Sequence, residues 1–346
     1  MKIAILTFVK AINYGAVLQA FALSEKLKSY GADVYFLNYN NKKIQSSNSV
    51  FDFKRLLNLK YTIAHLYNLP CAIKRYKLFK KFRKEHLKFT NDIPQNFDAV
   101  ITGSDQVWNY NLTDNDWFYF LDFKKKNTKK IAYAASFGIN DIDCIKKNKI
   151  EDYLKDFDFI SVRENSAVSL VKQISAQEAS LVLDPTLLLT KNEWTEFLNS
   201  TKNNRPYIFV YTVENNKEVW EFAKKLSLKT KLPICSISYS KLHKQNAVYN
   251  FNAGPQQWLE YILGAKYVVT NSFHAIAFSI NFQKQFFFNA PNSTSSRIID
   301  LTNRYNLSHR EINSCQINSK IDYTLVNKML KNERELSEKF IEKFMN

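Results

Sequence analysis

Short apolar runs alternate with longer amphipathic segments along the first 39 residues. Residues 2–9 form an apolar run that predicts a buried strand, and residues 16–29 repeat apolar side chains at nearly helical spacing. Gly31 ends that predicted helix, and the run at 34–39 predicts a second strand. A strand, a helix and a second strand within so few residues indicate a βαβ unit, and therefore a parallel sheet.

The same alternation returns after a basic, helical insertion at 41–90. Further strands are predicted at 97–102, 130–136, 159–163, 181–185, 207–213, 232–237, 267–270 and 285–288. Helices are predicted to begin at 165 and to cover 215–229, 254–264, 274–281, 295–306 and 322–346. Strands and helices thus alternate in two halves of the chain, which join near 186–205.

The length of 346 residues suits two domains. We therefore predict an α/β protein with two Rossmann-like αβα domains that face each other across a cleft. The N-terminal domain would cover 1–190 with the insertion at 41–90, the C-terminal domain would cover 205–321, and a C-terminal helix would follow at 322–346. In doubly wound sheets ligands bind beyond the carboxyl ends of the strands, and the polar motifs described below fall there.

Charge changes this picture in one region. The chain carries 49 Lys and Arg against 32 Asp and Glu, which gives +17 and favours an anionic partner. Residues 50–90 supply eleven of the bases and two of the acids, so 11 − 2 = +9 of the excess is local. Residues 74–88 form a basic amphipathic helix, which predicts contact with an anionic membrane surface while its apolar side packs on the domain. Because no zinc-finger, RRM or KH signature accompanies it, nucleic acid is not predicted as a partner.

The remaining composition is that of an ordinary globular protein. Hydrophobic residues make up 45% and charged residues 23%, which excludes a disordered chain. Four scattered cysteines without a C-x-x-C motif fit neither a zinc site nor a disulfide framework. No apolar stretch approaches the length of a transmembrane helix, and the N-terminal run is too short for a signal peptide. We therefore predict a cytoplasmic protein without a metal site.

Two motifs in the first half are candidates for ligand contact. Asn13-Tyr14-Gly15 opens the first helix, where unpaired N–H groups suit an anion or a sugar hydroxyl, although a plain turn capped by Asn13 explains it equally well. The loop 103–109 follows a strand directly and holds Ser104, Asp105, Gln106, Trp108 and Asn109. A polar loop with one large aromatic suits sugar stacking with hydrogen bonding, and Asp105 could act as a base toward a sugar hydroxyl. A capping loop would need only Ser104 or Asp105.

Three segments carry the remaining candidates. Arg163 and Glu164 end a strand, where the guanidinium can bind a carboxylate or phosphate or form an interdomain ion pair. Asp184 precedes Pro185 and is interpreted as a cap of the next turn. His274 stands at the start of a small, apolar helix, where the helix N-terminus favours anion binding. The segment 292–297 adds hydroxyl groups and the guanidinium of Arg297 before another helix.

Taken together, these segments resemble the polysaccharide pyruvyl transferase family. The matching motifs are Asn13-Tyr14-Gly15-Ala16-x-Leu18-Gln19-Ala20, Gly103-Ser104-Asp105-Gln106-Val107-Trp108-Asn109, Ala134-Ala135-Ser136-Phe137-Gly138, Ser161-Val162-Arg163-Glu164, Asp184-Pro185-Thr186 and Asn271-Ser272-Phe273-His274. Their order and spacing cover about residues 2–310, which is nearly the whole chain.

The resemblance implies a fold like that of the GT-B glycosyltransferases. It also implies phosphoenolpyruvate as donor, a sugar as acceptor and a pyruvate ketal on a cell-surface glycan as product, with no cofactor beyond that co-substrate. The acceptor would be a galactose- or mannose-type hexose on a lipid-linked diphosphate such as undecaprenyl diphosphate. That carrier lies at the inner face of the plasma membrane, and the helix 74–88 would dock there.

The resemblance also implies roles for individual residues. An arginine and a histidine bind the donor in relatives, and Arg163 and His274 match them. Many members carry Arg-Leu-His where this chain has Ser272-Phe273-His274, so Arg297 or a lysine would replace the missing arginine. Donor binding is thus assigned to Arg163, Ser272, Phe273, His274 and Arg297, and catalysis to His274 and Asp105. Acceptor binding is assigned to Asn13, Tyr14, Gly15, Gln19, Ser104, Asp105, Gln106, Trp108 and Asn109.

Two other function classes remain open. One is a GT-B glycosyltransferase that uses a nucleotide sugar on the same architecture. The other is a noncatalytic glycan-binding protein, which the missing arginine at Ser272 would favour.

Overall fold

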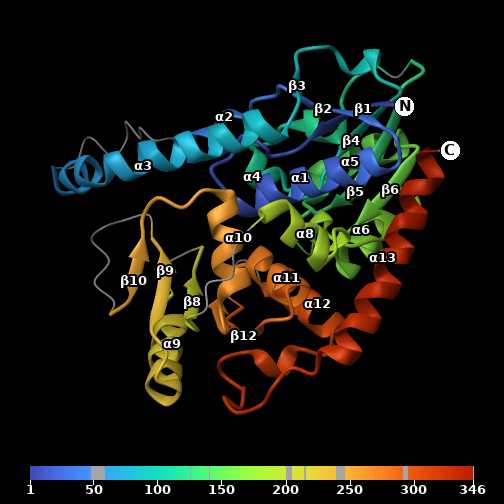
Figure 1. Cartoon of the computed structure of the whole chain (residues 1–346). Helices are drawn as coiled ribbons and strands as arrows, with labels where there is room; N and C mark the ends of the chain where they lie inside the picture. The colour runs from blue at the N-terminus through green and yellow to red at the C-terminus, as the bar shows by residue number, and fades with distance from the viewer. Residues whose placement is uncertain are drawn as a thin grey trace. The chain divides into compact units, whose positions relative to one another are not determined.

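The computed structural model describes residues 1–47, 59–124, 126–139, 141–199, 205–213, 216–238, 246–290 and 295–345. The chain divides into two compact units (Figure 1). Unit 1 comprises Met1–Asn48, Arg83–Leu189 and Lys328–Asn346, and unit 2 comprises Ser49–Phe82 and Thr190–Asn327. Each unit is built around its own parallel sheet, so the predicted α/β class with two Rossmann-like halves is confirmed.

The sheet of unit 1 has seven strands in the order β3-β2-β1-β4-β5-β6-β7, and every pair is parallel. The strands are β1 (Lys2–Leu6), β2 (Asp33–Leu37), β3 (Phe89–Thr90), β4 (Ala99–Thr102), β5 (Lys129–Ala135), β6 (Phe159–Val162) and β7 (Ser180–Leu181). All four residues of β4 are buried, as expected for a central strand covered on both faces. The strand order reverses between β1 and β4, and that switch point is where doubly wound sheets bind ligands.

Helices connect the strands of unit 1. They are α1 (Tyr14–Ser29), α2 (Lys42–Ser47), α4 (Tyr110–Thr113), α5 (Cys144–Lys155), α6 (Asn165–Ser175) and α7 (Pro185–Leu188), with short 3-10 turns η2 (Pro94–Asn96) and η3 (Trp117–Phe120). The long helix α3 (Leu59–His86) ends in unit 1, and α13 (Tyr323–Met345) lies mostly in it. In α6 the buried side chains recur at helical spacing, which is why this segment packs as an amphipathic helix.

The sheet of unit 2 has five parallel strands in the order β10-β9-β8-β11-β12 (Figure 1). The strands are β8 (Ile208–Tyr211), β9 (Ile234–Ile237), β10 (Val248–Asn250), β11 (Tyr267–Thr270) and β12 (Gln285–Phe288). The helices are α8 (Lys191–Leu198), α9 (Lys217–Thr230), α10 (Pro255–Gly264), α11 (Phe273–Asn281) and α12 (Ser295–Arg304), with the 3-10 turn η4 (Ser308–Arg310). Here the order reverses between β8 and β11, so unit 2 has a switch point of its own.

Most predicted elements are confirmed to within a few residues, and several are corrected. The sequence did not predict α4, α5, α7, α8, β3 or β10. The strand predicted at 181–185 is shorter, and Pro185 begins α7 as the first helical residue. The predicted helical insertion at 41–90 is helical at 42–47 and 59–86, but its last two residues form β3. Its residues 48–58 lie outside the described ranges, and residues 49–82 belong to unit 2. In the described ranges no helix combines the length and apolar character needed to cross a bilayer.

Candidate functional site

The loops at the carboxyl edge of the unit 1 sheet meet around one buried guanidinium. Arg163 follows β6 directly, and its side chain is 1% exposed. Its Nη1 lies 2.7 Å from Asp184 Oδ2, its Nε lies 2.9 Å from Glu164 Oε1, and its Nη2 lies 3.4 Å from Asp105 Oδ1. These carboxylates come from loops after three different strands, so the sheet order brings them together.

This cluster carries more negative than positive charge. One guanidinium and three carboxylates give a formal charge of 1 − 3 = −2. Burial alone would lower the pKa of Arg163, but the charges of Glu164, Asp184 and Asp105 outweigh it and raise the pKa above its ordinary value. The three carboxylates disfavour a donor carboxylate or phosphate at this place, and the donor-binding role of Arg163 stays a prediction. All three carboxylates lie in unit 1, so these ion pairs form within that unit.

Asp184 has two functions in this cluster. Its Oδ1 accepts hydrogen bonds from the Thr186 backbone N (3.0 Å) and Oγ1 (2.8 Å), so it caps α7 as predicted. Its Oδ2 accepts from Arg163 and from Ser104 Oγ (3.2 Å). Asp184 therefore ties the loop after β4 to the loop after β7.

Gln19 and Ser104 position the loop after β4 rather than face a ligand. Both side chains are fully buried. The Ser104 backbone N donates to Gln19 Oε1 (3.1 Å), and Gln19 Nε2 donates to Thr7 Oγ1 (2.9 Å). Thr7 Oγ1 in turn donates to the Ser104 carbonyl (2.9 Å). Because this ring of hydrogen bonds satisfies both ends of the Gln19 amide, the acceptor-binding roles predicted for Gln19 and Ser104 are corrected to positioning roles.

The backbone of this loop is special at two positions. A Cβ on Gly103 (φ +110°) would lie 2.3 Å from the Tyr133 carbonyl oxygen, so only glycine fits there. Asp105 adopts φ 83°, which is uncommon for a residue with a side chain and concentrates at functional sites. Its carboxylate accepts from the Gln106 backbone N (2.9 Å) and keeps 11% of its surface exposed. Asp105 is thus the acidic side chain of the cluster that a bound molecule could reach most easily.

Gln106 and Asn109 form a small polar corner beside Asp105. Asn109 Oδ1 accepts from the Leu112 backbone N (3.1 Å) and caps α4, while Asn109 Nδ2 donates to Gln106 Oε1 (3.1 Å). A Cβ on Gly138 (φ +64°) would lie 2.0 Å from Gln106 Oε1, so a glycine at this position leaves room for the Gln106 side chain. Gln106 remains partly exposed, and the acceptor contact predicted for it stays a prediction.

Trp108 does not lie in the site. Its ring is fully buried and stacks on Phe120, with centroids 5.4 Å apart, and it also contacts Phe137 and Phe157. A ring enclosed by three aromatic side chains has no free face for a sugar. The structure therefore corrects the stacking role predicted for Trp108 and assigns it to the hydrophobic core.

The start of α1 matches the plainer interpretation of its motif. Asn13 is exposed, and its Oδ1 accepts from the Ala16 backbone N (3.2 Å) as an N-cap. Tyr14 and Gly15 are buried in the first turn. Capping accounts for Asn13, and the acceptor contacts predicted for Asn13, Tyr14 and Gly15 stay predictions.

In unit 2, the loop after β11 forms a second polar corner. Asn271 Oδ1 accepts from the Val213 backbone N (2.9 Å), so it ties the loop after β8 to the loop after β11. Ser272 caps α11, with its Oγ 3.4 Å from the Ala275 backbone N. Phe273 and His274 follow in the first turn and are 8% and 9% exposed. The structure therefore places the predicted histidine at a helix N-terminus at the carboxyl edge of the sheet.

Arg297 lies in the first turn of α12, which packs against α11. It is 7% exposed. Residues 292–294, which include the hydroxyls of Ser293 and Thr294, lie outside the described ranges. His274 and Arg297 thus belong to the first turns of neighbouring helices.

Comparison with known families decides the assignment. A family model described as polysaccharide pyruvyl transferase matches residues 13–293. The chain belongs to the polysaccharide pyruvyl transferase family. The match covers both units, and it contains every predicted site residue except Arg297. A search of the curated proteins gives no significant match.

Solved structures similar to this pyruvyl transferase family member cover nearly its whole length at low similarity. UDP-GlcNAc 2-epimerase from Methanocaldococcus jannaschii has a TM-score of 0.46 and 11% identity, over 100% of this chain and 93% of that one. The S. aureus MnaA–UDP co-structure has a TM-score of 0.45 and 10% identity, over 95% and 94%. E. coli heptosyltransferase WaaC with ADP has a TM-score of 0.40 and 11% identity, over 96% and 100%. Such distant likenesses say nothing about substrate or reaction.

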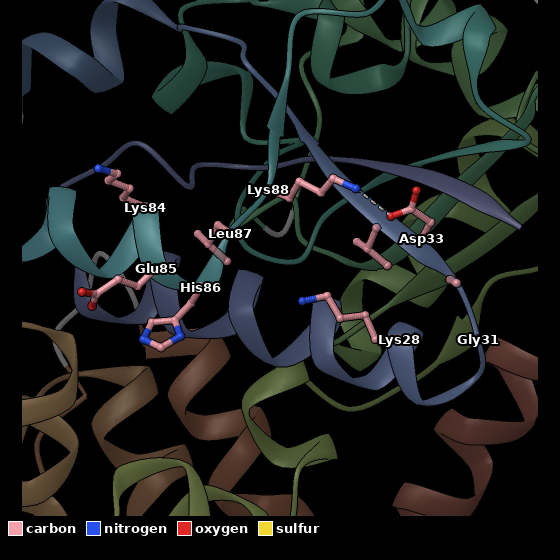
Figure 2. A pocket seen from close by; sticks show the side chains of 10 residues that line it. Lys28, Gly31, Asp33, Lys84, Glu85, His86, Leu87 and Lys88 are labelled. Atoms are coloured by element: carbon pink, nitrogen blue, oxygen red, sulfur yellow. Dashed lines mark hydrogen bonds and ion pairs between the residues drawn. The ribbon is translucent and has the colours of Figure 1, made fainter.

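A hollow of about 610 Å³ lies elsewhere in unit 1, between the ends of α1 and α3 and the start of β2 (Figure 2). Two of its lysines are paired, Lys88 with Asp33 (3.1 Å) and Lys28 with Glu25 (2.8 Å). It lies at the amino end of β2, away from the edge where parallel sheets bind ligands. We therefore do not assign the transferase chemistry to it. The described residues contain no group of three or more metal-ligating side chains.

Proposed function

We propose that this pyruvyl transferase family member moves pyruvate from phosphoenolpyruvate onto two hydroxyls of a sugar during cell-surface polysaccharide synthesis. The family match over residues 13–293 carries this proposal. The acceptor would be a galactose- or mannose-type hexose on a lipid-linked diphosphate. A basic chain at +17 suits a donor and an acceptor that both carry negative charge.

The proposed reaction needs one acid and one base. A proton adds to the methylene carbon of phosphoenolpyruvate, one sugar hydroxyl adds to the neighbouring carbon, and that hydroxyl loses its proton. Phosphate then leaves with its bridging oxygen, the second hydroxyl adds, and its proton is released. Two hydroxyl protons leave the sugar in total: one balances the proton taken up by the methyl group and the other leaves with phosphate.

Unit 2 supplies the groups that suit the donor. His274 is the acid that would protonate the methylene carbon, because an imidazole can exchange protons near neutral pH. Arg297 would bind the donor phosphate or carboxylate through two hydrogen bonds. Ser272 and Phe273 would shape the wall beside them.

Unit 1 supplies the group that suits the acceptor. Asp105 would accept the proton of a sugar hydroxyl, since its carboxylate is partly exposed at a sheet edge rich in hydrogen-bonding groups. The three carboxylates around Arg163 would disfavour an anionic donor at this place. Arg163 is therefore proposed as a positioning residue for Asp105.

The direct test supplies phosphoenolpyruvate and a series of aryl hexosides, and measures phosphate release together with a mass gain equal to one pyruvate ketal. His274→Ala should lower kcat by at least about 100-fold, the usual contribution of a general acid. His309→Ala, at an exposed histidine of unit 2, is the matched control and should leave turnover unchanged. Near-normal turnover in His274→Ala would remove this histidine from the mechanism. Consumption of a nucleotide sugar without phosphoenolpyruvate would replace the proposal with a glycosyltransferase.

We also propose that α3 docks on an anionic membrane surface. Its exposed lysines occupy one side of the helix, whereas Phe79 and Phe82 are buried on the other. The lysines of α3 described as exposed are Lys74, Lys77, Lys80, Lys81 and Lys84. Each lysine near an anionic leaflet contributes about 1 kcal/mol of attraction, which salt screens.

Liposome sedimentation tests this docking. Changing Lys74, Lys77, Lys80 and Lys84 to Gln should abolish binding to phosphatidylglycerol vesicles at low salt. A matched variant removes the same charge from α9, with Lys217, Lys224, Lys225 and Lys229 changed to Gln, and it should retain binding. Equal loss in both variants would show that only net charge matters and would contradict docking through α3.

A further inference from the structure

Two cations that sequence reasoning did not single out meet at the loop between β1 and α1. Lys10 lies in this loop and is partly buried. Arg83, at the end of α3, is 9% exposed, and its Nη1 donates to the carbonyl oxygens of Lys10 (3.2 Å) and Ala11 (3.4 Å). All three residues belong to unit 1. The guanidinium therefore holds the Lys10 backbone in place.

The charges of the two side chains repel each other. Burial lowers the pKa of Lys10, and the positive charge of Arg83 lowers it further. In the part of the chain that the structure describes, no carboxylate lies within ion-pair distance of Lys10. The nearby carboxylate of Asp116 accepts hydrogen bonds from Tyr39 (2.8 Å) and Asn41 (2.8 Å) instead. A bound anion would offset this repulsion.

A small hollow opens at the same place. It is lined by Thr7, Phe8, Lys10, Ala11, Tyr39, Asn40, Asn41, Ile44 and Tyr119. Its volume of about 10 Å³ has room for about one oxygen atom or one water molecule. It lies just beyond the carboxyl ends of β1 and β2, the edge of the sheet that carries ligands in such folds. A tetrahedral anion could place one oxygen in the hollow and its other oxygens at the rim beside Lys10.

Thr7 connects the hollow to the loop that carries Asp105, the residue proposed to contact the acceptor. Thr7 lines the hollow, and its hydroxyl also donates to the Ser104 carbonyl, in the peptide that leads to Asp105. The helix α1 begins four residues after Lys10 and has no acidic residue in its first turn, so its N-terminus adds to the positive potential. The same loop system thus offers a carboxylate for a hydroxyl and a cation for an anion.

We propose that Lys10 binds the phosphate or diphosphate through which the acceptor sugar is attached to its carrier. This inference rests on the proposed function in assuming a sugar acceptor on a diphosphate, and it adds the residue that would hold that diphosphate. Arg83 is a positioning residue that holds the Lys10 backbone and strengthens the local potential.

Binding of inorganic pyrophosphate to the full chain tests the subsite without any turnover. Lys10→Gln should weaken binding by about tenfold or more, as expected for one charge-assisted hydrogen bond. Lys147→Gln removes an exposed lysine of α5 in unit 1 and should change the dissociation constant less than about twofold, in keeping with the small contribution of an exposed charge. Circular dichroism and the Tm establish that both variants fold. Equal affinity of Lys10→Gln and the unchanged protein would overturn the proposal.

Kinetics with paired acceptors separate this proposal from the proposed function. With phosphoenolpyruvate present, Lys10→Gln should raise KM for galactosyl diphosphate esters and leave KM for methyl galactoside and both kcat values unchanged. A polyprenyl ester and a nucleotide ester of galactose serve as the two diphosphate sources, and the one with the lower KM is the natural carrier class. Equal changes with methyl galactoside would overturn the subsite. No turnover with any acceptor, but Lys10-dependent pyrophosphate binding, would reject the transferase reaction and retain the subsite.

Discussion

Two buried arginines show how differently the two units accommodate a positive charge. Arg163 in unit 1 is surrounded by the carboxylates of Asp105, Glu164 and Asp184. Arg310 in unit 2 is fully buried, but it donates to backbone carbonyls of Phe286 (2.8 Å) and Ser319 (2.7 Å). Its guanidinium also lies 4.0 Å from the centre of the Phe287 ring. Ionic charges stabilise one arginine, whereas dipoles and a π face stabilise the other.

The surroundings of the two arginines shift their pKa values in opposite directions. Carboxylates raise the pKa of Arg163 despite its burial, whereas burial lowers the pKa of Arg310. Arg310 has no ion-pair partner among the described residues, so this part of unit 2 keeps an excess of positive charge. The cluster around Arg163 has an excess of negative charge.

The largest effect is expected from Arg163→Met. Removal of the guanidinium leaves three buried carboxylates facing one another, and loss of one partner from a buried ion pair costs about 3–5 kcal/mol. The free energy of unfolding, measured by urea denaturation at pH 7, should fall by that amount. Arg163→Lys keeps the charge but not the fork of donors, and it should lose less. A loss under about 1 kcal/mol in Arg163→Met would show that the carboxylates do not depend on Arg163.

Arg310→Met should have a smaller effect. The variant leaves no charge unpaired, but it leaves carbonyl acceptors at Phe286 and Ser319 without their donor. Unsatisfied acceptors cost about 1–3 kcal/mol, and the methionine side chain retains part of the packing on Phe287. The same urea experiment measures the difference between the two variants. If Arg310→Met were as damaging as Arg163→Met, the contrast between ionic and dipolar stabilisation would be wrong.

The sequence predicted the fold well because parallel strands are buried on both faces and therefore appear as continuous apolar runs. The elements it missed lack that signal. In α5 only Ile150 and Leu154 are buried, so its apolar periodicity is weak. Before α8, the capping box of Thr190 and Glu193 was a usable signal that the apolar pattern did not emphasise.

The candidate site was predictable in position but not in charge. Asp105, Arg163 and Asp184 each follow a strand, so their place at one sheet edge could be inferred. That their side chains converge depends on the strand order, which no local pattern contains. Trp108 was misassigned because a sequence does not show whether an aromatic ring in a polar loop turns outward or into the core.

Lys284 is a third cation for this comparison, and its substitution is expected to change the free energy of unfolding least. It is a partly buried cation of unit 2 near Lys191, and its backbone carbonyl accepts a hydrogen bond from Tyr323. Burial, and then the charge of Lys191, lower the pKa of Lys284 to about 8. The unfolded chain therefore binds the proton of the Lys284 ammonium group more tightly than the folded chain does. The charged lysine destabilises the fold below pH 8, and this destabilisation disappears as the pH rises toward the ordinary pKa of lysine.

Lys284→Met should raise the free energy of unfolding at pH 7 by about 1–2 kcal/mol, after allowance for partial exposure. Urea denaturation between pH 7 and pH 10.5 should show this advantage shrinking, while Lys224→Met, at an exposed lysine of α9, should show no pH-dependent gain. A constant advantage across that range would mean that methionine acts through packing alone, and that unit 2 tolerates an unmatched cation at no electrostatic cost.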